Sequence, residues 1–268
     1  MFSFNPVSNQ SAVEFTHDRF QVGSCRLWLP EAVSTDRGLA GVYPDGMAWQ
    51  KNGDELVQEA STKQVFGPGN VNEIKPGILE CCGIRMRKER PLPWRATYHF
   101  GDDRMDFSLS VCNPHNETLP KVAAEVCFKF MQASWWSDSV CFLLTTDGVQ
   151  TIEQLGRAGG QSNTFQAWLL ENETYDNPFT REFWGYGVAR VADPIWVSRC
   201  EKAGCSVVLG CETAYYIHSN AGNPCTDLAL KFGDLAVGMS ATCSGYIEFT
   251  TKSIKQIFEA RRFFRCSI

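Results

Sequence analysis

The sequence lacks the features that mark membrane or exported proteins. No run of about 18 apolar residues occurs in its 268 residues, so no membrane-spanning helix is predicted. The first residues, MFSFNPVSNQSAVEF, contain no basic segment followed by an apolar one, which is the pattern of a secretory signal. We therefore expect a cytoplasmic protein with no membrane partner.

An excess of positive charge is also missing. The chain has 25 Lys and Arg against 30 Asp and Glu, which gives a formal net charge of -5. A protein that binds nucleic acid along its phosphates needs a basic stripe, so nucleic acid is not expected as a partner. The glycine-containing stretches GRAGG and FGPGN lack the strand-to-helix context of a nucleotide-binding loop, so no cofactor is predicted.

The twelve cysteines do not fall into metal-binding spacings. No C-x2-C pair and no His-x3-His pair occurs, so no metal site is predicted. Most cysteines lie inside apolar strand-like runs, such as Cys127 in VCFKF and Cys205 and Cys211 in CSVVLGC. Cysteine behaves in such places as a small core residue, and we expect mostly free thiols.

The dominant positive signal is a series of short strand-like runs. They are rich in β-branched and aromatic residues and recur about every ten positions. Clear examples are RATYHF (95–100), MDFSLSVC (105–112), VAAEVCFKFM (122–131), SVCFLLTT (139–146), FQAWLL (165–170), WGYGVARV (184–191), IWVSRC (195–200), CSVVLGC (205–211) and ATCSGYIEFT (241–250). We predict an all-β fold, a large antiparallel β-sandwich that forms a single domain over residues 1–268.

Local patterns refine this prediction. The turn GDDR at 101–104 predicts an antiparallel pair of flanking strands. In MDFSLSV, apolar and polar residues alternate, as they do in a strand with one buried face. CSVVLGC is apolar on both faces and is predicted to be covered on both sides. A short C-terminal packing helix is predicted in SIKQIFEARRFF (253–264), whereas residues 1–80 show the least regular pattern.

The order of features over residues 94–251 resembles the galactose-mutarotase-like β-sandwich superfamily, which includes sugar epimerases, polysaccharide lyases and glycoside hydrolase domains. Two stretches carry the resemblance. One is the Asn-rich turn after residue 112, with Asn113, Glu117, Leu119 and Pro120 in an N-x-x-x-E-x-L-P pattern. The other is the stretch NPCTDLALKFGDLAVGMSATCSGYIEF (223–249), in which a turn with two glycines is similar to the closing hairpin of that group.

The resemblance implies a concave sheet surface that binds a carbohydrate. The chain departs from the group where mutarotases carry a His-Pro-aromatic-Phe segment, because VCFKFMQASWW (126–136) has neither histidine nor proline. What the resemblance then implies is a sugar-binding groove with another set of acid and base residues, or with none.

Histidine is scarce, with four residues in the chain. His99 lies in the predicted strand RATYHF, where Arg95, Thr97 and His99 point to one face and Tyr98 to the other. Arg95 is predicted to neutralise the carboxylate of a sugar acid, and His99 to accept its C5 proton. The alternative is a histidine that is hydrogen-bonded on an ordinary polar face.

His218 is the second candidate base. It stands near the end of a predicted strand in YYIHSNAGNPC (215–225), with Asn220 in the following turn as a candidate ligand-binding residue. Glu212, Asp227 and Glu125 are candidate acids because each lies inside or beside an apolar strand pattern. The alternative interpretation makes each of these an ordinary strand residue with a hydrogen-bond or ion-pair partner.

Aromatic residues supply the candidate sugar platforms. Trp135 and Trp136 in QASWWSDS, and Trp184 and Tyr186 in REFWGYG, stand in predicted strand ends or loops. Flat rings of this kind stack on the C–H face of a sugar. Adjacent residues of a strand point in opposite directions, so at most one tryptophan of the pair is predicted to be exposed. Both are also compatible with a place in the core.

A local cluster of basic residues, IRMRKERPLPWR (84–95), is the candidate anion-binding surface, with Arg85 as its proposed ligand contact. Two functions remain open. One is an enzyme that transfers a proton on a sugar or uronic acid, with His99 or His218 as base and Arg95 or Arg85 orienting the anion. The other is a non-catalytic carbohydrate-binding or assembly domain. The sequence sets no oligomeric state.

Overall fold

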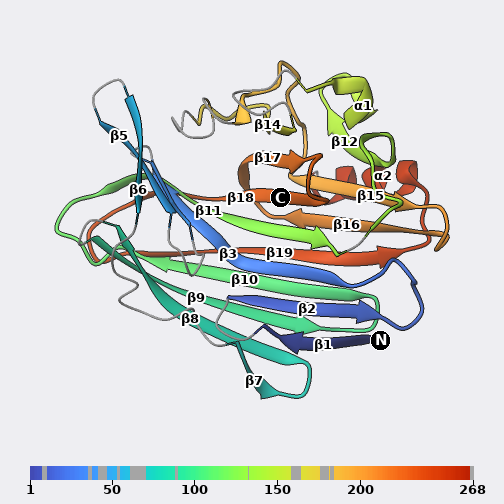
Figure 1. Cartoon of the computed structure of the whole chain (residues 1–268), viewed down its shortest axis with the longest axis horizontal. Coiled ribbons are helices and arrows are strands. Elements are labelled where there is room, and N and C mark those ends of the chain that lie inside the picture. The colour runs from blue at the N-terminus through green and yellow to red at the C-terminus, as the bar shows by residue number, and fades with distance from the viewer. Residues whose placement is uncertain are drawn as a thin grey trace.

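The computed structural model describes residues 1–7, 11–35, 38–41, 47–52, 55–60, 71–87, 90–131, 133–157, 164–175, 181 and 184–265. Within these ranges the chain forms strands β1 to β19, short helices η1 (Asp138–Val140) and α1 (Ile152–Leu155), and helix α2 (Ile254–Arg265). Figure 1 shows the long strands running in similar directions across the molecule, with α2 beside β15 and β16.

The strands form two large sheets in which every assigned strand pair is antiparallel. The ten-stranded sheet has the spatial order β14 (Phe165–Leu169), β17 (Ala214–Asn220), β18 (Cys225–Leu235), β11 (Leu119–Phe130), β3 (Cys25–Thr35), β4 (Gly38–Gly41), β5 (Met47–Asn52) and β6 (Glu55–Ala60), with β2 (Ala12–His17) beside β3 and β1 (Phe2–Pro6) beside β2. The nine-stranded sheet has the order β13 (Gly148–Thr151), β12 (Cys141–Thr145), β15 (Ile195–Cys200), β16 (Cys205–Cys211), β19 (Ser240–Thr250), β10 (Arg104–Cys112), β9 (Arg90–Phe100), β8 (Ile78–Arg87) and β7 (Asn72–Lys75).

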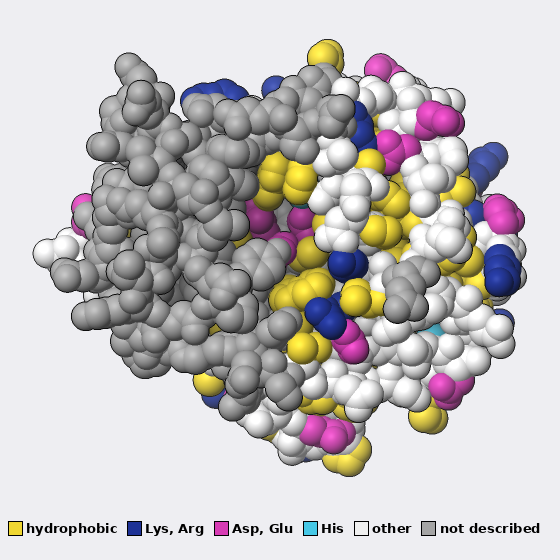
Figure 2. Space-filling model, viewed as in Figure 1, with side chains coloured by type: hydrophobic (Ala, Val, Ile, Leu, Met, Phe, Trp, Pro, Cys, Tyr) yellow, Lys and Arg dark blue, Asp and Glu magenta, His cyan; other side chains and the backbone are white. Residues whose placement is uncertain are grey.

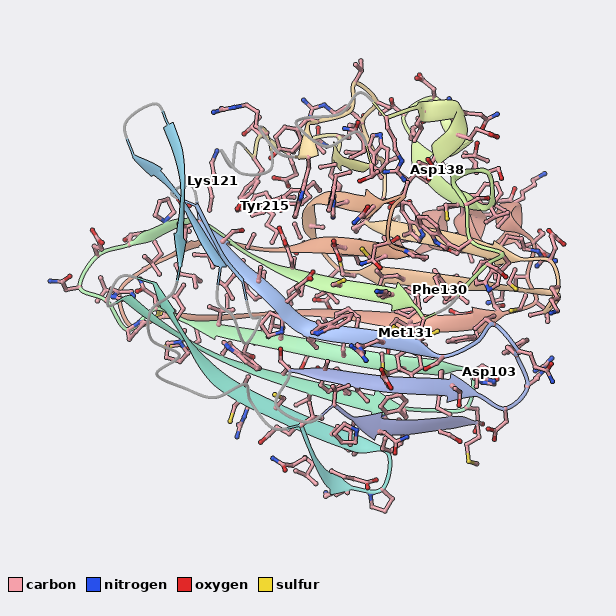
Figure 3. The ribbon with its side chains drawn as sticks, viewed as in Figure 1. Asp103, Lys121, Phe130, Met131, Asp138 and Tyr215 are labelled. Atoms are coloured by element: carbon pink, nitrogen blue, oxygen red, sulfur yellow. The ribbon has the colours of Figure 1, made fainter. Side chains whose placement is uncertain are left out.

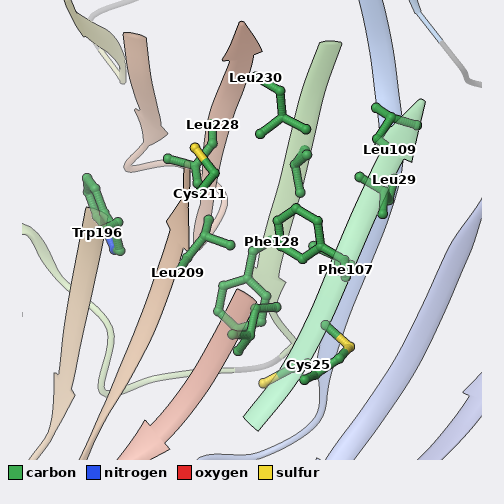
Figure 4. Packing of buried hydrophobic residues seen from close by; sticks show 14 of the residues in the cluster. Cys25, Leu29, Phe107, Leu109, Phe128, Trp196, Leu209, Cys211, Leu228 and Leu230 are labelled. Carbon is green, nitrogen blue, oxygen red and sulfur yellow. The ribbon is translucent and has the colours of Figure 1, made fainter. Parts of the chain in front are cut away.

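One apolar core fills the space between the sheets, which confirms the predicted antiparallel β-sandwich. Phe128 and Leu228 from the ten-stranded sheet meet Phe107 and Leu209 from the nine-stranded sheet, and all four are buried (Figure 4). The apolar residues of β10 face this core while the polar residues between them face outward, as the alternation predicts. β16 is buried along its whole length, as its continuous apolar sequence predicts.

The predicted hairpin around GDDR is confirmed. β9 and β10 pair antiparallel with Phe100 opposite Met105. Tyr98 is fully buried in the core, while Arg95 and His99 are exposed on the outer face of the nine-stranded sheet. The alternation along β9 therefore assigned these residues to the correct faces.

Two local predictions were wrong, and one region is more regular than its sequence pattern. Residues 1–80, which have the least regular sequence pattern, contribute β1 to β7 and the start of β8, and β3 is among the central strands. Residues 184–191 form only isolated bridges and not a regular strand. β18 and β19 are consecutive but lie in different sheets, so the predicted closing hairpin is instead a connection that crosses the sandwich.

The Asn-rich turn and this crossover meet in space. Asn113 is fully buried, and its side-chain amide donates hydrogen bonds to the backbone oxygens of Leu235 at 2.8 Å and Glu117 at 2.9 Å. Its side-chain oxygen accepts the backbone N–H of His115. One buried asparagine thus ties the turn after β10 to the end of β18, because buried backbone oxygens need a donor.

The outer faces of the two sheets differ. On the nine-stranded sheet, Ile257 and Phe258 of α2 pack on Val197, Val208 and Tyr246. On the ten-stranded sheet, aromatic residues and alanines form a separate cluster that includes Tyr175, Trp184 and Tyr216. Among the described residues, no helix is both long and apolar enough to span a bilayer.

Candidate functional site

Small side chains leave a hollow on the outer face of the ten-stranded sheet. Alanines point outward from four of its strands, namely Ala32 of β3, Ala123 of β11, Ala167 of β14 and Ala229 of β18. Figure 2 shows that carboxylate-bearing side chains gather at the bottom of a hollow over the middle of this sheet. Apolar side chains form part of the border of the hollow in the same view, and the carboxylate-bearing side chains lie deeper than this border.

Glu125 lies at the centre of this face. It is opposite Ala32 on one neighbouring strand and Ala229 on the other, so no bulky neighbour covers it from the sheet itself. Its side chain is buried, and the hydroxyl of Tyr216 donates a hydrogen bond to Oε1 at 2.5 Å. Burial, and then the neighbouring Asp227, raise the pKa of Glu125 well above its usual value, so Glu125 favours the protonated form.

An irregularity in β3 brings a second carboxyl group to the same place. Ala32 pairs with Glu125 and Trp28 with Cys127, so three residues of β3 stand opposite a single residue of β11. Such a bulge changes the direction of side chains, and Glu31 belongs to the inserted residues. Glu31 keeps some exposed surface, and burial together with Asp227 raises its pKa.

His218 and Asp227 form a buried pair on adjacent strands. They are directly opposite in the register of β17 and β18, and His218 Nδ1 lies 2.6 Å from Asp227 Oδ2. Burial raises the pKa of Asp227 to about 7 and lowers the pKa of His218 well below 6.5, with Arg157 adding to the second effect. Burial therefore favours the uncharged form of each partner.

Aromatic rings close over the imidazole. The ring of Trp184 stacks on that of His218 with centroids 3.7 Å apart, and Phe165 stacks at 5.3 Å. Arg157 is held nearby because it donates two hydrogen bonds to Asp138, which lies beside α1 (Figure 3), and two to Ser219. These contacts fix the orientation of His218, whose Nε2 is buried without a hydrogen-bond partner among the described residues.

Two thiols belong to the same floor. Cys127 follows Glu125 by two positions on β11, so both face outward, and Cys127 is opposite Asp227 in the register. Cys225 lies two positions before Asp227, and its thiol accepts a hydrogen bond from that of Cys127. The floor of the hollow thus combines three carboxyl groups, an imidazole, a phenol and two thiols, which can donate, accept and exchange protons.

Of the predicted catalytic residues, the structure brings His218 to the hollow and leaves the other three elsewhere. His99 and Glu212 line a groove of about 420 Å³ on the outer face of the nine-stranded sheet, with Arg104, Asp106 and Tyr246. The two histidines therefore face opposite sides of the sandwich. In this groove, Glu212 accepts the backbone N–H of Ser244 at 3.2 Å.

The predicted anion-binding arginines do not reach the hollow. Arg95 is exposed on the outer face of β9, where its guanidinium lies 3.2 Å from the carboxylate of Glu80 on β8. Arg85 belongs to β8 of the nine-stranded sheet, and its side chain lies outside the described residues. Arg157, which no sequence pattern singled out, lies closer to the candidate site than either of them.

The tryptophan pair belongs to the core. Trp136 is buried in the main apolar cluster, and Trp135 packs at its edge with its ring 4.8 Å from that of Phe130. The indole N–H of Trp135 donates to the backbone oxygen of Val22 at 3.0 Å. Neither indole contributes to the hollow, which matches the core interpretation that the sequence left open.

The remaining predicted ligand-binding residues surround His218. Trp184 stacks on it, Asp227 hydrogen-bonds to it, and Tyr186 lies with its ring 6.3 Å from that of Tyr216. Asn220 uses its side-chain oxygen to accept the backbone N–H of Gly222, so it stabilises the turn after β17. Sequence reasoning had selected Glu125 but not Glu31, because Glu31 reaches the site through a bulge that alternation does not reveal.

No protein-family model matches the sequence, and a search of curated proteins finds no match. Solved structures that are similar include a galactose mutarotase related enzyme from Lactobacillus acidophilus (9% identity, TM-score 0.48, 94% of this chain and 99% of the other). A galactose mutarotase-like protein from Lactobacillus casei is also similar, with 10% identity and a TM-score of 0.48 over 92% of this chain and 100% of the other. So is one from Clostridium acetobutylicum, with 10% identity and a TM-score of 0.45 over 94% of this chain and 99% of the other. The chain is thus similar over most of its length to galactose mutarotase-like structures, at low sequence identity.

Proposed function

We propose that the hollow on the ten-stranded sheet binds a sugar or uronic acid unit and transfers a proton on it. One observation carries the proposal, namely that Glu125 of β11, His218 of β17 and Asp227 of β18 converge on the floor of this hollow. Carboxyl and imidazole groups are the side chains that most often act as general acids and bases.

The neighbours of these groups suit a ligand rich in hydroxyl groups. Glu31 and Glu125 offer carboxyl oxygens, while Tyr216 holds the carboxyl group of Glu125 and Arg157 holds the strand beside His218 through hydrogen bonds. A sugar hydroxyl both donates and accepts, so a floor of mixed donors and acceptors can read its orientation. The alanines opposite Glu125 on both neighbouring strands keep bulky side chains of the sheet away from its carboxyl group.

Glu125 is the residue to test first. Replacing Glu125 by Gln keeps its shape but removes its ability to take up and release a proton. We expect Glu125→Gln to slow anomer or epimer exchange by roughly 10²- to 10⁴-fold. Exchange is measured by proton NMR over a panel of aldoses and uronic acids, and affinity by saturation-transfer NMR on the same panel.

The matched control is Glu212→Gln, because Glu212 is a carboxylate on the outer face of the other sheet. The sugar exchange rates of the Glu212→Gln variant are expected to equal those of the unchanged protein. Equal loss in both variants, or no binding of any sugar by the unchanged protein, would contradict the proposal.

A non-catalytic sugar-binding domain is the second candidate, and the cover over His218 favours it. Trp184 is only 8% exposed and stacks directly on the imidazole, which closes one face of that ring to a substrate. This function predicts that the protein binds sugar without catalysing its exchange. The affinity for sugar should then fall in Trp184→Ala, and Glu125→Gln should leave the exchange rate unchanged.

A further inference from the structure

Cys127, Cys225 and Asp227 form a cluster on the floor of the hollow, and the proposed proton transfer uses only Asp227 of the three. Their ligand atoms, two Sγ and one carboxylate oxygen, all lie within 4.8 Å of one another. The three side chains come from the paired strands β11 and β18, and each is more than nine-tenths buried. Because the strands hold them in register, the cluster is built by the sheet and not by a loop.

The hydrogen bonds around Cys127 are incomplete. Its thiol lies within hydrogen-bonding reach of the carboxyl groups of Glu31 and Asp227 and of the thiol of Cys225. A thiol carries one proton and can therefore satisfy one of these three acceptors at a time. The other two groups are then left without this donor in a buried place.

Asp227 supplies an independent observation that points to a missing ligand. Its Oδ2 holds His218, whereas its Oδ1 is buried and has no hydrogen-bond partner among the described residues. An imidazole that fixes one oxygen of a carboxylate while the other stays available is the arrangement that orients a metal-binding carboxylate.

We propose that Cys127, Cys225 and Asp227 bind a divalent transition-metal ion of the zinc type, with Glu31 placed to complete the coordination. Two thiolates and one carboxylate select such an ion over Mg²⁺ or Ca²⁺, which prefer oxygen ligands alone. Binding releases the two thiol protons to solvent. Zn–S bonds of about 2.3 Å place two sulfur ligands of a tetrahedral site roughly 3.8 Å apart, so binding draws together any donor atoms that lie near the 4.8 Å limit.

The sequence hides this site because its ligands do not follow a local spacing. Cys127 and Cys225 are separated by almost a hundred positions and become neighbours only when β11 pairs with β18. The site adjoins the hollow but does not depend on the sugar proposal, since its formation requires only the three side chains.

The test uses the full chain, reduced and stripped of metal, and Co²⁺ as a spectroscopic probe. The unchanged protein is expected to bind one equivalent of Co²⁺, with a thiolate-to-cobalt charge-transfer band in the near ultraviolet and visible bands typical of tetrahedral coordination. Zn²⁺ is expected to displace the cobalt and to raise the melting temperature.

Cys127→Ser and Cys225→Ser are expected to lose the charge-transfer band and the Zn²⁺-dependent rise in melting temperature. The control is Cys82→Ser, since Cys82 is an exposed thiol on β8 and its loss should change neither signal. Circular dichroism checks that each variant is folded. If a variant does not fold, the cobalt-to-protein ratio and band intensity of the unchanged protein still decide the question.

Two results would overturn the proposal. One is a reduced, folded protein that gives no charge-transfer band with Co²⁺, and the other is a band of equal intensity in Cys225→Ser. Glu125→Gln separates this proposal from the previous one, because it keeps all three metal ligands and should bind Co²⁺ whether or not sugar exchange occurs.

Discussion

The polar residues of the hollow take their properties from their immediate neighbours. Glu125 has alanines on both sides along the sheet, yet it is only 2% exposed, and the hydroxyl of Tyr216 holds its carboxyl group. His218 is equally buried and lies under Trp184. Each of these buried groups therefore takes its properties from the side chains that contact it.

A second thiol pair allows a test of pH dependence away from the hollow. Hydrogen bonds from Cys211 and Thr213 lower the pKa of Cys243 from 9.0 to about 7. Between pH 7 and pH 9 the unfolded chain then binds more protons than the folded protein, so stability should rise with pH over this range and lose this contribution as pH falls through 7. The gain is on the order of 2 kcal/mol.

Urea unfolding at pH 7, 8 and 9 measures this effect. The free energy of unfolding of the unchanged protein should rise relative to that of Cys243→Ser, which cannot form a thiolate at this position. Cys82→Ser should follow the unchanged protein. Parallel curves for the unchanged protein and Cys243→Ser would show that Cys243 is not a thiolate in the folded state.

Among the elements, β19 packs so closely against its neighbours at Gly245 that no larger side chain fits there. A Cβ added at Gly245 would lie 2.3 Å from a ring carbon of Phe107 and 2.6 Å from the backbone oxygen of Gly210. Real atoms do not approach so closely, so Phe107 or the strand must shift. Phe107 belongs to the main core, where displaced side chains have little free space.

We therefore expect Gly245→Ala to lower the free energy of unfolding by about 1–3 kcal/mol. The matched control is Gly222→Ala in the turn after β17, where the nearest atom would lie 3.4 Å away. Denaturant unfolding of both variants measures the difference. A Gly245→Ala protein as stable as the control would mean that Phe107 has more freedom than the structure shows.

At the scale of the whole molecule, one core joins the two sheets. Its buried residues extend from Phe2 to Phe249 along the chain, and β1 at the N-terminus packs against the same cluster as β19 near the C-terminus. The aromatic rings of Phe2 and Phe249 lie 5.5 Å apart. The first and the last strand of the sandwich thus pack on a common core.

This continuity predicts a single cooperative unfolding transition for the full chain. Calorimetry should give a calorimetric enthalpy equal to the van't Hoff enthalpy, although the chain is longer than most two-state proteins. Near- and far-ultraviolet circular dichroism should change together. Two separated transitions would contradict the proposed single domain and would indicate that the sheets unfold independently.

The amino-acid sequence determined those features that depend on neighbours along the chain. Alternation in β10 separated core residues from surface residues, and alternation in β9 placed His99 and Tyr98 on opposite faces. The GDDR turn fixed one strand pair. These features are readable because strand faces repeat every two residues and tight turns need particular residues.

Only the tertiary structure decided which strands lie side by side. The crossover of β18 and β19 into different sheets, the bulge that admits Glu31, and the meeting of Cys127 with Cys225 all depend on long-range pairing. A period of two tells which residues of one strand share a face, but it does not identify the partner strand. The candidate site brings β3 and β11 beside the consecutive strands β17 and β18, so its composition appears only when folding has set the order of strands in the sheet.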